Sequence, residues 1–235
     1  MVDISIRGEL WDDDSADILR WWGFRDITAP MDIRSALEAA GGDEVTVLVN
    51  SPGGDMAVGA EIRSMLRRYQ GKTTALFQGY GASAATLAVS ACTVIQSEPG
   101  ALLCYHNPSN TTSGDFHEMR RSAEALRNAR DCILEMYTAR SGSRSREELI
   151  SLMDKNIWIT PTQAREYGLI DEIVGAAQEP EEEPAAFVAA AGRRIRLTAA
   201  MREQYQAHVA AERAEAARKD EAASTLARLR ALAGF

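Results

Sequence analysis

Ser83 and His106, together with the pair Gly53-Gly54, are the residues whose types and settings could support nucleophilic catalysis. Ser83 stands where an apolar strand is expected to end and a helix of small residues to begin, with two glycines shortly before it. A serine on such a turn is held out of the sheet, beside the free amides of a helix N-terminus. Since a serine there is more often only a helix cap, this residue alone does not establish catalysis.

A serine hydroxyl becomes a nucleophile when a base that titrates near pH 7 takes its proton, and histidine is the usual base. His106 follows the apolar run 101–105 and therefore stands at the carboxyl end of an expected strand, where α/β sheets place functional groups. A lone histidine at such a place is often structural. Gly53 and Gly54 follow another strand, so their amides could form part of an oxyanion hole or simply a tight turn.

The elements that would position these residues alternate between strand and helix patterns. We expect strands at 3–7, 44–49, 72–78, 92–96, 101–105 and 169–174, and helices at 31–40, 56–69, 84–91, 115–139, 145–153 and 161–167. This alternation, with β-branched runs such as 44–49, predicts an α/β fold with mostly parallel strands. The composition changes at Ala176, so we expect a folded domain over 1–175, an acidic and alanine-rich linker over 176–197 and a helical tail over 198–235.

Charge and composition exclude several classes of function. The formal net charge of −8 argues against nucleic acid as a partner, because that needs a clustered basic face. No apolar run approaches the roughly 20 residues that span a bilayer, and no signal peptide opens the chain, so we expect a soluble, intracellular protein without a membrane partner. Cys92, Cys104 and Cys132 lack paired spacing, which predicts three buried thiols. The run Asp12–Asp14 is more typical of a helix start than of a metal site, and we expect neither metal nor cofactor.

Four segments, taken in order, resemble the ClpP family of serine peptidases. They are Asn50-Ser51-Pro52-Gly53-Gly54, Gly81-Ala82-Ser83-Ala84-Ala85, Tyr105-His106-Asn107-Pro108, and the run from Pro161 to Asp171. Ser83 and His106 lie 23 positions apart, as the family pattern requires, and the Ala-x-Glu-Tyr-Gly-Leu-x-Asp run is a specific signature. The resemblance covers about residues 3–175.

The resemblance implies that Ser83 is the nucleophile and His106 the general base. It implies that the amides of Gly53 and Ala84 form the oxyanion hole, and that Gly54 extends the strand that binds the substrate backbone. The implied fold is the ClpP/crotonase-like β-superhelix of β-β-α units. The helix at 115–139 would be the long handle helix that stacks rings of six or seven subunits, and a helical tail would follow the domain.

One position departs from the family pattern. Fifteen residues before Asp171, where the family has the third residue of its triad, an aspartate, this chain has Asn156. An asparagine can accept the ring N–H of His106 and hold its tautomer, but it cannot offset the charge of an imidazolium. We therefore predict Asn156 as the residue that orients His106, with slow turnover or an inactive variant as the alternative. We set Asp154 aside because it would point to the other side of an extended segment.

Within the family, the short segment before the first strand, the Trp11 and Trp21-Trp22 stretch and the tail after Ala176 resemble the head maturation (prohead) proteases of tailed bacteriophages. This predicts a serine endopeptidase that cuts scaffold or capsid precursors. Its own tail, at 186–194, is a further candidate substrate. It would form a ring homo-oligomer and act in the cytoplasm of the bacterial host or inside the immature head.

Two alternatives stay open within the fold: a host-type ClpP paralogue that works with an ATPase, and a catalytically degenerate assembly protein. A crotonase-fold acyl-CoA enzyme is disfavoured, because those enzymes have no serine–histidine pair in this order.

Overall fold

The computed structural model describes residues 2–142, 144–175 and 197–233. The described residues form two compact units, of which the smaller combines residues 17–24 with the C-terminal helix. Except for its last residue, the expected linker over 176–197 lies outside the described residues, as does the expected cleavage region 186–194. The domain boundaries at 175 and 198 stay predictions.

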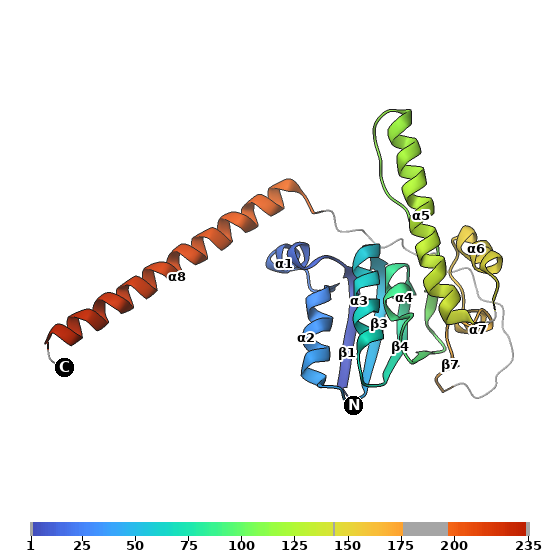
Figure 1. The fold of residues 1–235 in the computed structure, drawn as a ribbon, viewed down its shortest axis with the longest axis horizontal. Coiled ribbons are helices and arrows are strands. Elements are labelled where there is room, and N and C mark those ends of the chain that lie inside the picture. Colours follow the sequence, from blue (N-terminus) through green and yellow to red (C-terminus); the bar gives the residue numbers. More distant parts are fainter. Residues whose placement is uncertain (1, 143, 176–196, 234–235) are drawn as a thin grey trace. The chain divides into compact units, whose positions relative to one another are not determined.

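The larger unit is built on a seven-stranded sheet whose strand pairs are all parallel within the described chain (Figure 1). The strands are β1 (Val2–Leu10), β2 (Ile27–Thr28), β3 (Val45–Gly54), β4 (Thr73–Ala82), β5 (Val94–Ser97), β6 (Leu102–Cys104) and β7 (Glu172–Ile173). Their order is β2-β1-β3-β4-β5-β7, and β6 pairs with the end of β4. The predicted α/β class with parallel strands is confirmed.

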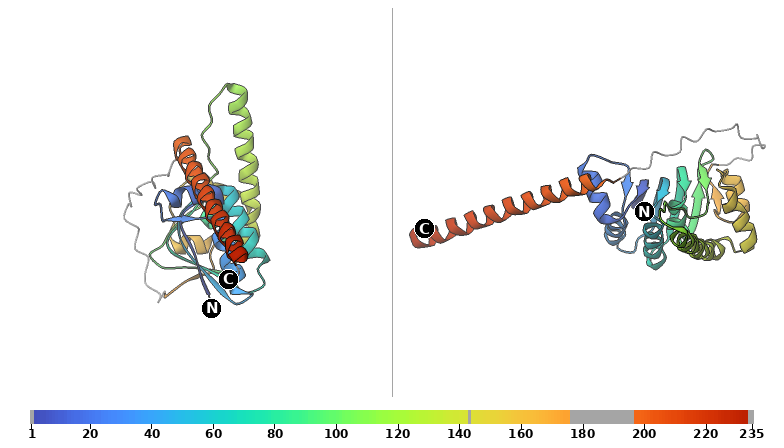
Figure 2. Two further views of the ribbon diagram at one scale, coloured as in Figure 1. Left: turned by 90° about the vertical axis from the view of Figure 1, so that its left-hand side faces the viewer. Right: turned by 90° about the horizontal axis from the view of Figure 1, so that it is seen from above.

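The helices are α1 (Asp13–Trp21), α2 (Pro30–Ala40), α3 (Met56–Arg68), α4 (Ala84–Val89), α5 (Phe116–Ser141), α6 (Arg146–Lys155), α7 (Pro161–Glu166) and α8 (Ala199–Ala233). Helices α2, α3 and α4 lie side by side along one face of the sheet (Figure 2). The side chain of Asp55 caps α3 by accepting the N–H of Ala57 at 2.6 Å, and Asp115 caps α5 in the same way. These caps set the starts of the two helices.

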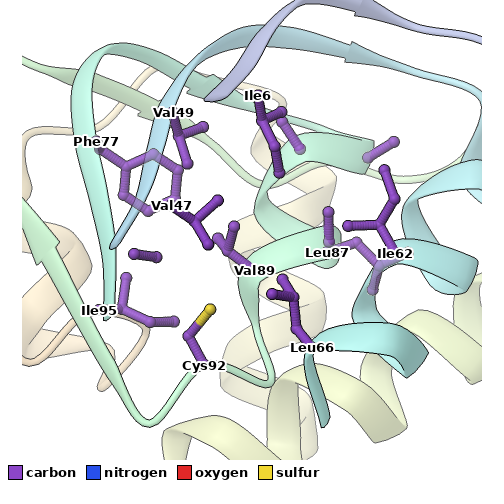
Figure 3. Packing of buried hydrophobic residues seen from close by; sticks show 14 of the residues in the cluster. Ile6, Val47, Val49, Ile62, Leu66, Phe77, Leu87, Val89, Cys92 and Ile95 are labelled. Carbon is purple, nitrogen blue, oxygen red and sulfur yellow. The ribbon is translucent and has the colours of Figure 1, made fainter. Parts of the chain in front are cut away.

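The hydrophobic core lies between the sheet and these helices (Figure 3). Its labelled members are Ile6, Val47, Val49, Ile62, Leu66, Phe77, Leu87, Val89, Cys92 and Ile95. Alternate residues of β3 and β4 point into this layer, which is why their β-branched and aromatic side chains are buried while their neighbours are not. Each fully buried large side chain contributes roughly 1.5–3 kcal/mol to stability.

Three strands extend beyond the ends that the sequence predicts. β1 was expected to end before Gly8, but Gly8 adopts a φ of 63° at a register shift and pairing resumes at Glu9. β3 continues through the Pro-Gly-Gly run to Gly54, opposite Leu10, and β4 continues to the residue before Ser83. A glycine in the left-handed region lets the chain bulge without leaving the sheet. These extensions bring the candidate site residues to one edge.

The smaller unit joins residues 17–24 to the start of α8. The Trp21 ring centroid lies 5.0 Å from that of His208 and 6.0 Å from that of Tyr205, and the Trp22 indole N–H donates to the carbonyl of Met201. Both tryptophans therefore contact the first part of the C-terminal helix. No helix in the described ranges combines the length and apolar character needed to cross a membrane.

The structure also tests the predictions for the acidic run at 12–14 and for the three cysteines. The acidic run does start a helix, because the Asp12 carboxylate accepts the N–H of Ser15 at 2.9 Å and α1 begins at Asp13. Cys92 and Cys104 are buried free thiols, and burial raises the pKa of Cys92 to about 12. Cys132 is exposed on α5, so the expectation of three buried thiols is wrong for that residue.

The long helix α5 is buried only along its second half. Ile133, Leu134 and Tyr137 enter the core, whereas the first half projects beyond the sheet (Figure 1). Phe116 is 65% exposed and Met119 43% exposed, so the apolar side chains of this helix are buried at one end only. A helix segment without tertiary contacts is marginally stable in water. We therefore predict that a second subunit covers this half.

We expect the protein to sediment well above its monomer mass of 25.6 kDa. Phe116→Glu combined with Met119→Glu should shift it toward the monomer with the circular dichroism spectrum retained, because charges would then face the covering subunit. Asn128→Glu, an added charge on the opposite side of the same helix, is the control and should not change the sedimentation. A wild-type monomer at micromolar concentration would contradict this expectation.

Candidate active site

Ser83 occupies a strained turn between β4 and α4. Its φ is 55° and its ψ −130°, and only one other non-glycine residue in the described chain, Asn156, has a positive φ. A serine in such a conformation costs about 1–3 kcal/mol, which the surrounding structure must offset. Although Ser83 immediately precedes α4, its side chain makes no capping hydrogen bond. The hydroxyl is therefore not used as a helix cap, which was the alternative explanation of this serine.

The end of β6 holds the segment that carries His106 against the Ser83 turn. Ala82 pairs with Cys104, and the Ser83 N–H donates to the Cys104 carbonyl at 2.9 Å. His106 follows two residues later in the same segment, and both Ser83 and His106 are half-buried. The two residues are 23 positions apart in sequence, yet parallel strand pairing brings their backbones together.

The His106 ring is oriented by the next residue in the chain. Its Nδ1 lies 2.7 Å from the carbonyl oxygen of Asn107. Because a carbonyl oxygen can only accept, Nδ1 must carry the proton in this contact, which leaves Nε2 as the basic nitrogen. This is the tautomer that a general base for Ser83 requires.

The Asn107 side chain is in turn held by α6, since its Nδ2 donates to Asp154 at 2.7 Å. Our reason for setting Asp154 aside is wrong: α6 continues to Lys155, so no extended segment runs through this region. Asn156 ends α6 with a left-handed backbone and an exposed side chain. Within the described residues no hydrogen bond joins it to His106. Its assignment as the orienting residue stays a prediction.

Gly53 packs directly against the Ser83 turn. It is buried with a φ of 93°, and a Cβ there would lie 2.6 Å from Ser83 Cβ and 2.9 Å from Ala84 N. Only glycine fits this position. Its N–H donates to Ser51 Oγ at 3.1 Å, while that hydroxyl donates to the Gly8 carbonyl at 2.6 Å.

The two amides predicted to form the oxyanion hole therefore differ in availability. The Ala84 N–H opens α4 without an acceptor in the described part of the chain, as is usual for a first helical turn. The Gly53 N–H would have to leave Ser51 Oγ to join it. Both remain predicted donors.

Gly54 has a backbone edge that no strand in the described residues pairs with. The N–H of Asp55 donates to the Leu10 carbonyl at 3.0 Å, and Gly54 is the residue opposite Leu10. Since successive residues in a strand direct their peptide groups to opposite edges, those of Gly54 face away from β1. Pairing between β3 and β4 has already ended at Ser51 and Gly81. This edge could bind an extended peptide by strand pairing, as predicted.

Other residues of the recognised segments have structural roles. The Asn50 side chain accepts the N–H of Tyr80 at 3.0 Å and so joins β3 to β4. Asp171 accepts the N–H of Ile95 at 2.7 Å and forms an ion pair with Arg140, which ties the signature run to β5 and α5. Burial raises the pKa of Cys104 to about 11, so this thiol beside the site is not a competing nucleophile near neutral pH.

Comparison with known proteins agrees with this architecture. The sequence model of the Clp protease family matches residues 33–177. The chain is 30% identical over 136 residues to an ATP-dependent Clp protease proteolytic subunit of Mesostigma viride, covering 57% of this chain and 59% of that protein. It is also 30% identical over 133 residues to proteolytic subunit 1 of Streptomyces avermitilis, covering 56% and 61%. The matches thus span about three fifths of the length of these curated relatives.

Among solved structures, an asparagine-to-aspartate variant of ClpP1 from Listeria monocytogenes superposes with a TM-score of 0.60 at 20% identity, covering 74% of this chain and 92% of that one. This confirms the expected ClpP/crotonase-like fold. With the family model matching more than half of its residues, the chain belongs to the Clp protease family.

The residue that orients the His106 ring can be identified by changing Asn156 and Asp154 one at a time. If Asn156 orients the ring during catalysis, Asn156→Asp should raise kcat by roughly tenfold or more, because a carboxylate stabilises the imidazolium and the reverse exchange in a serine protease costs about 10,000-fold. If Asp154 acts through Asn107 instead, Asp154→Asn should lower kcat. An unchanged kcat for Asn156→Asp would remove Asn156 from the mechanism.

Proposed function

We propose that the chain is a serine endopeptidase in which Ser83 is the nucleophile and His106 the general base. The observation that carries the proposal is the strained Ser83 turn, whose hydroxyl is left free of capping. The backbone of Gly53 and the strand leading to His106 pack against this turn. A strained serine whose N–H is bonded to the segment that leads to a histidine suits an acyl-transfer site.

In this mechanism His106 Nε2 accepts the hydroxyl proton as Ser83 Oγ bonds to the substrate carbonyl carbon. The resulting oxyanion accepts a hydrogen bond from the Ala84 N–H, and a second from Gly53 once its amide turns from Ser51. The imidazolium then gives its proton to the amine as the peptide bond breaks. Water, activated by the same nitrogen, cleaves the acyl-enzyme and restores Ser83. The substrate strand would pair with the free edge of Gly54.

We further propose that the substrates are scaffold or capsid precursors during phage head maturation, and that a ring of subunits carries out this processing inside the immature head. Support comes from α8, which lies outside the residues matched by the family model, and from Trp21 and Trp22, which pack on it. A peptidase domain joined to a helix of 35 residues suits an enzyme that must be retained by a larger assembly.

A host-type paralogue is the second candidate, because the curated relatives are described as proteolytic subunits of ATP-dependent proteases. The two functions differ in what they need for protein substrates. A maturation protease should cut a scaffold segment with no nucleotide present, whereas a proteolytic subunit should degrade folded proteins only when an ATPase ring and ATP are added.

A fluorophosphonate probe tests the nucleophile directly. We expect stoichiometric labelling on Ser83, and we expect Ser83→Ala to abolish both labelling and peptide hydrolysis while the unfolding temperature changes little. Ser90→Ala removes a different buried hydroxyl, one bonded to Arg63, and serves as the control that should still be labelled. Equal activity in the wild type and Ser83→Ala would refute the proposed mechanism.

Self-processing of the tail can be tested by intact mass. A segment in the same chain as an active site is presented to it at roughly millimolar effective concentration, so cutting within 186–194 should release about 40–50 residues during long incubation. The loss should occur in the wild type and not in Ser83→Ala. A full-length mass of both proteins would show that the tail is not a substrate.

A further inference from the structure

Tyr137, near the end of α5, contacts both segments that carry the candidate catalytic pair. Its hydroxyl lies 2.7 Å from Thr86 Oγ1, and that hydroxyl lies 2.7 Å from the carbonyl oxygen of Ser83. Its ring packs edge-on against Tyr105, with centroids 5.3 Å apart, and Tyr105 immediately precedes His106. One side chain thus reaches the serine turn through a hydroxyl and the histidine segment through a ring.

The donors in this chain of contacts are determined by chemistry. The Ser83 carbonyl can only accept, so the Thr86 hydroxyl donates its single proton to that oxygen. The remaining contact then requires the Tyr137 O–H to donate to Thr86 Oγ1. Thr86 is 2% exposed and Tyr137 4% exposed, so water does not replace either bond. Burial also raises the pKa of Tyr137, which keeps this hydroxyl protonated as a donor at any working pH.

The Thr86 hydroxyl donates its hydrogen bond to the carbonyl of Ser83, the residue with the strained backbone. The same oxygen accepts the N–H groups of Thr86 at 3.0 Å and Leu87 at 3.3 Å, and the Thr86 hydroxyl at 2.7 Å is the shortest of the three contacts. These bonds set the orientation of the peptide that follows Ser83, and that peptide carries the Ala84 N–H. Holding the carbonyl therefore holds the predicted oxyanion donor.

We propose that Tyr137 is a positioning residue, which holds the Ser83–Ala84 peptide in its reactive orientation by donating to Thr86. The proposal rests on the proposed peptidase function. It assigns a role to two residues outside the recognised family segments, 51 positions apart in the chain. It predicts that loss of the tyrosine hydroxyl affects the chemical step and not the binding of substrate.

The test uses the full-length protein and five variants, four with a single substitution and one that combines Tyr137→Phe with Thr86→Val. Tyr137→Phe removes the hydroxyl and keeps the ring against Tyr105, and Thr86→Val removes the hydroxyl that contacts Ser83. Thr86→Ser retains a hydroxyl and should rescue activity. The matched control is Thr138→Val, the next residue on α5, whose buried hydroxyl has no hydrogen-bond partner in the described structure. Each is measured for the second-order rate of Ser83 labelling by a fluorophosphonate, for kcat and KM on a peptide, and for unfolding temperature.

We expect Tyr137→Phe to lower kcat and the labelling rate about fivefold to tenfold, the effect of one buried neutral hydrogen bond, with KM unchanged. Thr86→Val should be slower still, and adding Tyr137→Phe to it should cause no further loss, because both act through one hydroxyl. Thr86→Ser and Thr138→Val should resemble the wild type.

Two results would overturn the proposal. Wild-type labelling rates in Tyr137→Phe, whether or not its unfolding temperature falls, would reduce the contact to a structural one while leaving the peptidase function intact. A wild-type chain that does not react at Ser83 at all would overturn the proposed function and this inference together.

Discussion

The positive φ of Ser83 is the constraint on which the rest of the site depends. The conformation is unfavourable for any residue with a side chain, so it persists only where neighbouring groups leave no alternative. The Cys104 carbonyl holds the N–H of Ser83 and Thr86 holds its carbonyl. Gly53 fills the remaining side so closely that a Cβ would collide with the turn. These contacts hold the hydroxyl at the end of the sheet, next to the Ala84 N–H, which has no acceptor among the described residues.

The Asn-Ser-Pro-Gly-Gly segment at 50–54 supports the Ser83 turn. Asn50 fixes the spacing between β3 and β4, and Ser51 connects the bulge at Gly8 to the N–H of Gly53. The same serine therefore controls whether the Gly53 amide is available to an oxyanion. A site of this kind can be assembled yet have one donor engaged, so substrate binding would complete it by drawing Gly53 away from Ser51.

The sequence predicted the elements with strong periodicity and missed the contacts that depend on distant residues. Strand and helix patterns place Ser83 and His106 correctly at strand ends, but glycines at 8 and 53–54 signal turns where the chain in fact continues in the sheet. Counting back from Asp171 gives Asn156. Counting cannot show that the Asn107 carbonyl already accepts the hydrogen bond from Nδ1 of His106. Thr86 and Tyr137 have ordinary core positions, and only the packing of α5 against α4 brings their hydroxyls together.

The most direct test of this account is a crystal structure of the protein after reaction with a small fluorophosphonate, whose phosphoryl oxygen occupies the place of the oxyanion. The account predicts a covalent bond to Ser83 Oγ and a positive φ retained at Ser83. It also predicts a phosphoryl oxygen within hydrogen-bonding distance of the Ala84 N–H and of a Gly53 N–H released from Ser51. An adduct on another residue, or a phosphoryl oxygen that contacts neither amide, would contradict it.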